Sequence, residues 1–264
     1  MVRRPLGNHH VGPDTLLVTS DPAQTEAVTA STEDLRRLLA PVRYVLWDLD
    51  GPICRLFAGH PADGVARELV KLVDRLGLGA LLTPSEREHR DPHAVLLGVS
   101  GRHPGNDLVG ALEEWVTRQE LQAVPGAFPT PHADPLIRTW SALGAVFAVT
   151  TNNSPRAATA YLRTRGLERC FAYVYGRTAD LGLMKPHPHC LLQALNVMGA
   201  DPAQALMLGD APTDFEAARK ARVPFLGYAR NEAKAHALLE AGVGRSRIVT
   251  DLSAVRAALV PRAR

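Results

Sequence analysis

The 264-residue chain has few cysteines, few lysines and no long apolar run, and each shortage excludes a class of protein. No run of apolar residues is long enough to cross a bilayer, so we expect no membrane partner. The three cysteines, Cys54, Cys170 and Cys190, are too few and too far apart for a zinc site or a disulfide framework. Reduced thiols, with no apolar signal region near the N-terminus, predict a cytoplasmic protein.

The charge of the chain gives no sign of a nucleic-acid partner. The net charge is +3, but only four lysines occur and the arginines are scattered rather than clustered among aromatic residues. An apolar fraction of 46% with a charged fraction of 22% is typical of a soluble globular protein. The sequence leaves its oligomeric state, monomer or homodimer, open.

Alternating strand and helix patterns predict an α/β fold with a doubly wound, Rossmann-like parallel sheet. A short apolar run at 42–48 is typical of a strand that is buried on both faces. Further strand patterns follow, at 142–153, 171–176, 203–210, 224–229 and 247–252. Helical patterns lie between them, at 154–166, 187–199 and 213–223. Repeated alternation of this kind places helices on both faces of one parallel sheet.

Three parts of the chain differ in pattern. Residues 1–40 are predicted to be an N-terminal extension, a loose tail followed by a short helix that starts at 31–34. Residues 41–54 and 124–264 are predicted to form the core with the sheet. Residues 55–123 are predicted to be a small helical insert, because apolar residues recur at helical spacing on both sides of a polar, His- and Pro-rich stretch. The two helical patterns are at 61–76 and 107–122.

Polar side chains gather where the predicted strands end. Asp48 and Asp50 follow the first strand, and Asp210 and Asp214 follow the fourth. Thr150, Thr151, Asn152 and Asn153 end the second strand, and Lys185 lies just before the fourth. Ligands of such sheets bind outside the carboxyl ends of the strands, so these residues are expected to meet in one crevice. A single aspartate there is more often a turn former or helix cap. The recurrence at successive strand ends favours a site.

The residue types of this set suit a divalent cation and a phosphate group. Clustered carboxylates such as Asp48 and Asp210 are ligands for Mg²⁺, which prefers oxygen. A hydroxyl and the Lys185 ammonium can hold phosphate oxygens and balance charge in the transition state. One aspartate can attack phosphorus, and a second, two residues on, can protonate the leaving oxygen and then activate water.

Four motifs resemble those of the haloacid dehalogenase superfamily in order and spacing. They are DLDG at 48–51, a strand ending in TN at 151–152, KP at 185–186 and GDAPTD at 209–214. The resemblance is to the Mg²⁺-dependent phosphatase branch, of the phosphoglycolate phosphatase and β-phosphoglucomutase type, and it covers about 41–54 and 124–230. In position and helical character the insert resembles the superfamily's first class of cap, which closes over the site and selects the substrate.

The resemblance implies a role for each acidic motif residue. Asp48 would be the nucleophile and a metal ligand. Asp50 would be the general acid and base, with its backbone carbonyl on the metal. Asp210 would be the remaining carboxylate ligand of Mg²⁺, and Asp214 would bind the metal directly or through water.

The other two motifs imply how phosphate is held. Thr151 and the Asn152 amide would bind the phosphate group, with Thr150 as a second candidate for the hydroxyl. Lys185 would steady both Asp48 and the phosphate. The implied substrate is a small phosphorylated metabolite, phosphoglycolate- or sugar-phosphate-like, hydrolysed through an aspartyl-phosphate.

Residues of the insert and its hinges are candidates for substrate selection. Arg55, Arg102 and His103 are the basic residues singled out, and the loop at 102–106 could dip towards the phosphate. A basic loop would suit a substrate with a second anionic group. One position departs from the family, since Pro52 stands where threonine usually follows DLDG.

Several alternatives share these motifs. A phosphomutase would have the same core residues. A phosphonate hydrolase would need a Schiff-base lysine in the insert, where Lys71 is the only lysine. Dehalogenases usually lack the second aspartate, present here as Asp50. A non-enzymatic phosphoacceptor domain also uses strand-end acids, a threonine and a lysine, although Asp50 and the long insert favour turnover.

Overall fold

Six parallel strands form the central sheet of the computed structural model, which describes residues 29–103 and 107–260. The strand order is β5-β4-β1-β6-β7-β8, and every neighbouring pair is parallel. The bounds are Tyr44–Trp47 (β1), Val146–Thr150 (β4), Phe171–Tyr175 (β5), Ala205–Gly209 (β6), Phe225–Tyr228 (β7) and Ile248–Val249 (β8). The chain builds outward from β1 on one side and then on the other. The predicted doubly wound sheet is confirmed.

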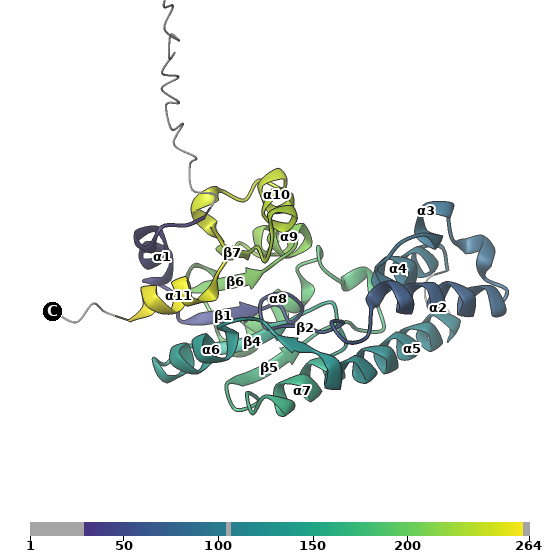
Figure 1. Cartoon of the computed structure of the whole chain (residues 1–264), viewed down its shortest axis with the longest axis horizontal. Helices are drawn as coiled ribbons and strands as arrows, with labels where there is room; N and C mark the ends of the chain where they lie inside the picture. Colours follow the sequence, from purple (N-terminus) through teal and green to yellow (C-terminus); the bar gives the residue numbers. More distant parts are fainter. Residues whose placement is uncertain (1–28, 104–106, 261–264) are drawn as a thin grey trace, which may run out of the picture.

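Helices cover both faces of this sheet (Figure 1). Val45 and Trp47 of β1 pack on one face and Leu46 on the other, and all three are fully buried. The first face is covered by α1 (Thr32–Leu39), α6 (Ala133–Ala142), α7 (Pro155–Thr164) and α11 (Leu252–Leu259). The second is covered by α8 (His189–Met198), α9 (Pro212–Lys220) and α10 (Glu232–Glu240). Burial on both faces explains why the strands are continuous apolar runs.

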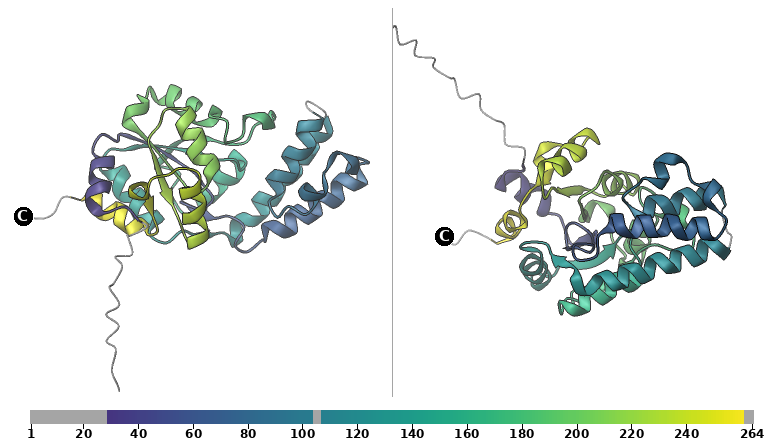
Figure 2. Two further views of the ribbon diagram at one scale, coloured as in Figure 1. Left: turned by 90° about the horizontal axis from the view of Figure 1, so that it is seen from above. Right: turned by 45° about the vertical axis from the view of Figure 1, so that its right-hand side comes forward.

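A helical unit projects from one end of the sheet, between β1 and β4 in the chain (Figure 2). It contains α2 (Ala62–Arg75), α3 (Pro84–Arg87), α4 (Pro92–Arg102) and α5 (Asp107–Ala123). A hydrophobic cluster fills the unit, in which Leu69, Leu96 and Leu112 are fully buried, and Leu181 and Met184 from the segment between β5 and α8 join it. The predicted helical insert after the first strand is therefore present, whereas its limits at 55 and 123 stay predictions.

The two crossings between sheet and helical unit lie side by side. β2 (Cys54–Arg55) pairs antiparallel with β3 (Phe128–Pro129). The Thr130 hydroxyl on the returning segment donates to the Gly51 carbonyl on the outgoing one. This bond ties down the loop after β1. Pro52 is buried in that loop, whose turns are closed by the N–H groups of Gly51, Ile53 and Cys54, so a residue without an N–H fits there.

Some elements differ from the sequence prediction. The stretch taken as polar in the insert contains α4, because Asp91 caps its N-terminus and Pro92 occupies its first turn, where proline is well tolerated. The strand predicted at 142–153 is shorter, and its first residue ends α6. Helices α6, α10 and α11 were not predicted. The predicted start of α1 is confirmed, because Ser31 and Asp34 form a capping box there.

Shorter features complete the description. Single turns of 3₁₀ helix occur at Gly79–Leu81, Val124–Gly126, Leu181–Leu183, Pro202–Gln204 and Arg245–Arg247. Within the described ranges, no helix combines the length and apolarity needed to cross a membrane. Of the predicted N-terminal extension at 1–40, residues 1–28 lie outside those ranges.

Candidate active site

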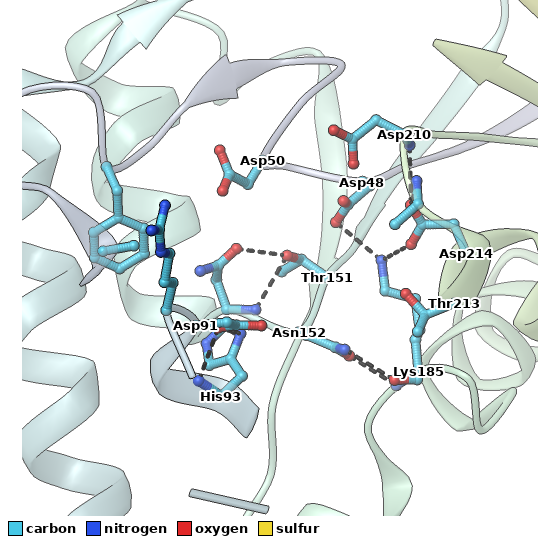
Figure 3. Close-up of a pocket in the computed structure, with 15 residues that line it drawn as sticks. Asp48, Asp50, Asp91, His93, Thr151, Asn152, Lys185, Asp210, Thr213 and Asp214 are labelled. Carbon is cyan, nitrogen blue, oxygen red and sulfur yellow. Dashed lines mark hydrogen bonds and ion pairs between the residues drawn. The ribbon is translucent and has the colours of Figure 1, made fainter. Parts of the chain in front are cut away.

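The predicted strand-end residues meet at one edge of the sheet. Asp48 directly follows β1, Thr151 follows β4 and Asp210 follows β6. The Asp48 N–H donates to the Leu208 carbonyl at 2.9 Å, which continues the pairing of β1 with β6. Parallel register brings these side chains into one cavity of about 260 Å³, which Asp50, Asn152, Lys185 and Asp214 also line (Figure 3).

The Lys185 ammonium is the centre of the site. Its Nζ lies 2.9 Å from Asp48 Oδ1, 2.6 Å from Asp214 Oδ1 and 2.9 Å from the Thr150 carbonyl oxygen. The side chain is buried, and burial alone would lower its pKa, but the charges of Asp214 and Asp48 outweigh this and raise the pKa. Lys185 is therefore a charged group with all three donors fixed.

Asn152 positions the backbone of Lys185. Its side-chain oxygen accepts the Lys185 N–H at 2.7 Å, and its side-chain NH₂ donates to the Lys185 carbonyl at 3.0 Å. The amide side chain is thus occupied with holding the lysine. The neighbouring Thr151 hydroxyl faces the cavity and donates to Asn153 Oδ1 at 3.1 Å. The Thr150 hydroxyl instead lies 3.4 Å from Met207 Sδ in the core.

Asp214 is fixed at the start of α9. Its Oδ2 accepts the N–H groups of Asp210 and Ala211, both at 3.0 Å, while Oδ1 accepts from Lys185. Gly209 makes this possible, because a Cβ there would lie 2.6 Å from Asp214 Cβ. Gly51, at φ 117°, is required in the same way, since a Cβ would overlap the Asp210 carboxyl.

Three buried carboxylates, Asp48, Asp210 and Asp214, form the carboxylate cluster, each with one oxygen within 4.8 Å of the others. Burial raises the pKa of Asp48 to about 7, with the charge of Lys185 acting against the rise and those of Asp214 and Asp210 adding to it. Burial also raises the pKa of Asp210 to about 6, although Lys234 lies 2.8 Å from its Oδ2. This set of oxygen donors fits a hard divalent cation, which would stabilise the ionised carboxylates.

The Asp50 carboxyl lies apart from the carboxylate cluster. Its Oδ1 accepts the Leu56 N–H at 2.9 Å, and its side chain lines the cavity. Burial raises the pKa of Asp50, and the Leu56 hydrogen bond partly offsets that rise. A carboxyl with a raised pKa beside, rather than inside, a cation site can exchange a proton with a bound group.

Of the three residues predicted to select the substrate, only Arg55 lines a space beside the site, whereas Arg102 and His103 do not. Arg55 lines a neighbouring hollow together with Asp50. Arg102 lines neither that hollow nor the cavity, because its guanidinium binds Glu86 at 2.9 Å and the carbonyls of Leu81 and Gly98 at 2.8 Å. His103 lines neither space, and positions 104–106 of the predicted loop lie outside the described residues.

A buried ionic network that was not predicted from the sequence contacts the backbone of Asn152, one of the residues that line the cavity. Arg177 is 5% exposed, and its Nη1 donates to Glu120 Oε1 at 2.7 Å and to the Asn152 carbonyl at 3.0 Å. Glu120, on α5, also accepts from the Ser154 N–H at 2.8 Å and from His93 Nε2 at 2.9 Å. The network joins the helical unit to the loop that holds Lys185.

The sequence contains a signal for Arg177 of this network and for Arg230, which lines the neighbouring hollow. Arg177 and Arg230 directly follow the third and fifth predicted strands. The rule that gathered the acids at strand ends would have gathered both arginines. Glu120 has no such signal, because it lies inside an ordinary amphipathic helix.

Because Glu120 is ionised in this network, we expect the free energy of unfolding of the protein to fall at acid pH. Burial alone raises the pKa of Glu120, but the His93 hydrogen bond and the Arg177 charge lower it to about 2, below its ordinary value of 4.5. A lowered folded-state pKa gives stability that is present above the unfolded value and is lost as the pH falls towards the folded one. The shift corresponds to about 3 kcal/mol, lost between about pH 5 and pH 2.

The measurement is urea unfolding from pH 7 to pH 2. Glu120→Gln should be less stable at pH 7 and should lose about 3 kcal/mol less than wild type on acidification. Equal acid dependence in the two proteins would show that Glu120 does not titrate with a lowered pKa.

Comparison with known proteins agrees with this geometry. The family model described as haloacid dehalogenase-like hydrolase matches residues 42–222, which include the core motifs and the helical unit. The chain belongs to the haloacid dehalogenase-like hydrolase family. The predicted family, and with it a hydrolase, is confirmed.

Two curated relatives of this hydrolase carry the same name. A phosphoglycolate phosphatase of Salmonella choleraesuis (strain SC-B67) is 28% identical over 225 residues, covering 78% of this chain and 89% of its own. A phosphoglycolate phosphatase of Mesorhizobium japonicum is 31% identical over 102 residues, 38% of this chain and 44% of its own.

Solved structures share the fold of this hydrolase. A predicted phosphatase from Clostridium acetobutylicum has a TM-score of 0.61 at 18% identity, covering 80% of this chain and 95% of its own. A HAD family hydrolase from Deinococcus radiodurans R1, solved with bound phosphate and sodium, has a TM-score of 0.53 at 24% identity. It covers 83% of this chain and 96% of its own.

Proposed function

We propose that this chain is a Mg²⁺-dependent phosphomonoester hydrolase that acts on a small phosphorylated metabolite through an aspartyl-phosphate at Asp48. One observation carries the proposal: a single buried ammonium, that of Lys185, is shared by Asp48 and Asp214 beside a carboxyl that is free of this pairing, that of Asp50. Phosphoryl transfer needs a nucleophile, a charge-balancing cation and a proton donor in one cavity.

The first half-reaction forms the covalent intermediate. Lys185 holds Asp48 Oδ1, so Asp48 Oδ2 is the oxygen that attacks phosphorus. The bond from phosphorus to the ester oxygen breaks, and Asp50 gives its proton to that oxygen. The Thr151 hydroxyl and the Asn152 backbone N–H donate to the phosphoryl oxygens, and the positive charge of the nearby Lys185 ammonium stabilises the negative charge that develops there.

The second half-reaction releases phosphate. Asp50, now ionised, takes a proton from a water molecule, whose oxygen attacks phosphorus. The bond between phosphorus and Asp48 breaks, and the Asp48 carboxylate returns to its contact with Lys185. The helical unit is proposed to act as a cap that excludes bulk water during these steps.

Asp48, Asp210 and the Asp50 backbone carbonyl are the proposed ligands of Mg²⁺, with Asp214 acting directly or through water. When bound, the cation neutralises carboxylate charge and draws phosphate oxygens towards Asp48. The direct contacts of Asp214 with Lys185 and two backbone N–H groups favour the indirect mode.

Metal removal should abolish activity. Dialysis against EDTA is expected to lower phosphate release to background, and added Mg²⁺ should restore it, because the carboxylate cluster otherwise repels an anionic substrate. Calorimetry should show weaker Mg²⁺ binding by Asp210→Asn than by wild type. Full activity in the chelated protein would contradict the proposal.

Asp50→Asn should slow both half-reactions by roughly 10²- to 10⁴-fold, because an amide cannot transfer the proton. Mg²⁺ binding should persist, since Asp50 contributes only its backbone carbonyl. Rapid-quench kinetics with calorimetry would measure both quantities. Loss of Mg²⁺ binding in this variant would assign the Asp50 side chain to the metal instead.

The function is tested by a phosphate-release assay over a panel of phosphomonoesters with Mg²⁺. Turnover with several small esters is expected. No release from any ester, together with stable self-phosphorylation, would instead indicate a phosphoacceptor domain.

A further inference from the structure

The cavity of the carboxylate cluster adjoins a second hollow that carries positive charge. This outer hollow has a volume of about 450 Å³ and shares part of its wall, including Phe57 and Arg90, with the inner cavity. Arg55 and Arg230 also line it. The three arginines come from separate segments of the chain. Arg55 lies in β2, Arg90 lies just before α4, and Arg230 lies just after β7. All three are exposed.

None of these arginines forms an ion pair within residues 29–103 and 107–260. The acids near them have other partners: Asp63 of the outer hollow binds Arg67 at 2.7 Å, and Asp91 of the inner cavity accepts the His93 N–H at 2.9 Å. Asp50 lines both spaces and accepts the Leu56 N–H at 2.9 Å, and the charge of Arg230 acts to lower its pKa against the rise that burial causes. Guanidinium groups that share one hollow and form no ion pair with its acids repel one another. Their convergence therefore favours an anion supplied by a ligand.

That anion is distinct from the reacting phosphate. In the proposed mechanism the reacting phosphate lies against Lys185 and Thr151, neither of which lines the outer hollow. Arg55 and Arg230 do not line the inner cavity. The organic part of a bound ester must therefore pass Phe57 and Arg90 to enter the outer hollow. A second anionic group on that part would meet guanidinium donors, which match carboxylate and phosphate oxygens.

We propose that Arg55, Arg90 and Arg230 form a second anion-binding subsite, and that the substrate is a short phosphomonoester with a second anionic group, either a carboxylate or another phosphate. This inference rests on the proposed phosphatase function and narrows it. Neutral sugar monophosphates become poor substrates, because they leave the arginines without a partner.

Matched substrate pairs test the subsite. In the carboxylate arm, 2-phosphoglycolate is compared with 2-hydroxyethyl phosphate, and 3-phosphoglycerate with glycerol 3-phosphate. In the phosphate arm, propane-1,3-diol bisphosphate is compared with its monophosphate. The anionic member of at least one arm should have a kcat/KM roughly 10- to 100-fold higher, the range expected for charged hydrogen bonds. The better arm identifies the second group.

Three single variants, Arg55→Gln, Arg90→Gln and Arg230→Gln, then locate the effect. Each should lower the ratio of kcat/KM between the anionic and neutral members, mainly through the KM of the anionic one. The ratio is insensitive to a general loss of folded protein. Arg118→Gln is the matched control, because Arg118 is an exposed arginine of the helical unit that lines neither space. Its ratio should stay at the wild-type value.

Equal kcat/KM within every pair would overturn the subsite while leaving the phosphatase function standing. A preference that all three variants retain, and that high salt removes, would also overturn it, because that result indicates long-range steering rather than contact. No hydrolysis of any ester would overturn both proposals.

Discussion

Asp48→Asn is expected to reduce phosphomonoester turnover by roughly 10⁴-fold or more, the scale of loss when a nucleophile is removed. An amide oxygen cannot attack phosphorus to form the acyl phosphate. The change is nearly isosteric and leaves Lys185 bound to Asp214 and to the Thr150 carbonyl, so the fold should persist. Steady-state kinetics on a small ester, with thermal unfolding as the folding check, measures the effect.

Two controls make this result specific. Asp74→Asn changes an aspartate of the helical unit that lines neither the cavity nor the outer hollow and whose partner, Arg87, is partly exposed, and it should leave turnover within a few-fold of wild type. Asp48→Asn preparations must also be free of deamidated protein, which would restore the carboxylate. Near wild-type activity in a verified Asp48→Asn protein would rule out Asp48 as the nucleophile.

Arg177→Met is expected to have the largest effect on stability. Its guanidinium pairs with Glu120, whose side chain is fully buried, and donates to the Thr117 hydroxyl at 2.9 Å. Removing one partner of a buried pair leaves an uncompensated charge and costs about 3–5 kcal/mol. Urea unfolding at pH 7 should show this as a lower midpoint with an unchanged slope.

An exposed pair provides the comparison. Arg156 lies 2.7 Å from Glu114, and both side chains are about half exposed. Arg156→Met should therefore cost less than about 1 kcal/mol. The double variant Glu120→Gln/Arg177→Met should recover part of the loss, because it removes the unpaired charge. Equal losses for Arg177→Met and Arg156→Met would show that burial does not set the cost.

The parts of the fold that the sequence predicted are those set by local pattern. β1 is recognisable because Val45, Leu46 and Trp47 are all buried, which requires an unbroken apolar run. The start of α1 is recognisable because Ser31 and Asp34 form a reciprocal cap within one turn. Such signals need no knowledge of distant contacts.

Other elements depend on packing that the sequence does not display. In α10 only Ala235 and Leu238 are buried, so the helix has almost no apolar stripe. Helix α4 follows His- and Pro-rich residues, yet Val95, Leu96 and Val99 fill the cluster of the helical unit. Tertiary packing decides both cases, and short local patterns are too weak to predict them.

The candidate site likewise contains residues that local sequence pattern predicted and contacts that it did not. Asp48, Lys185 and Asp210 were gathered by their places at or near strand ends, and the structure brings them into one cavity. Their roles in catalysis stay predictions until the variants are measured. No local pattern pairs Glu120 with Arg177, because this contact links residues 57 positions apart in different structural units. Only the three-dimensional structure shows that the network supports Asn152.

The measurement that tests the central claim most directly is the trapping of a phosphorylated Asp48. Asp50→Asn protein with Mg²⁺ and a small phosphomonoester is quenched in acid within the first turnover, reduced with borohydride and digested for mass spectrometry. We predict phosphorylation or its reduced product on the peptide that contains Asp48, and none in Asp48→Asn protein. Phosphate release with no covalent product, or with the label on another residue, would contradict the account.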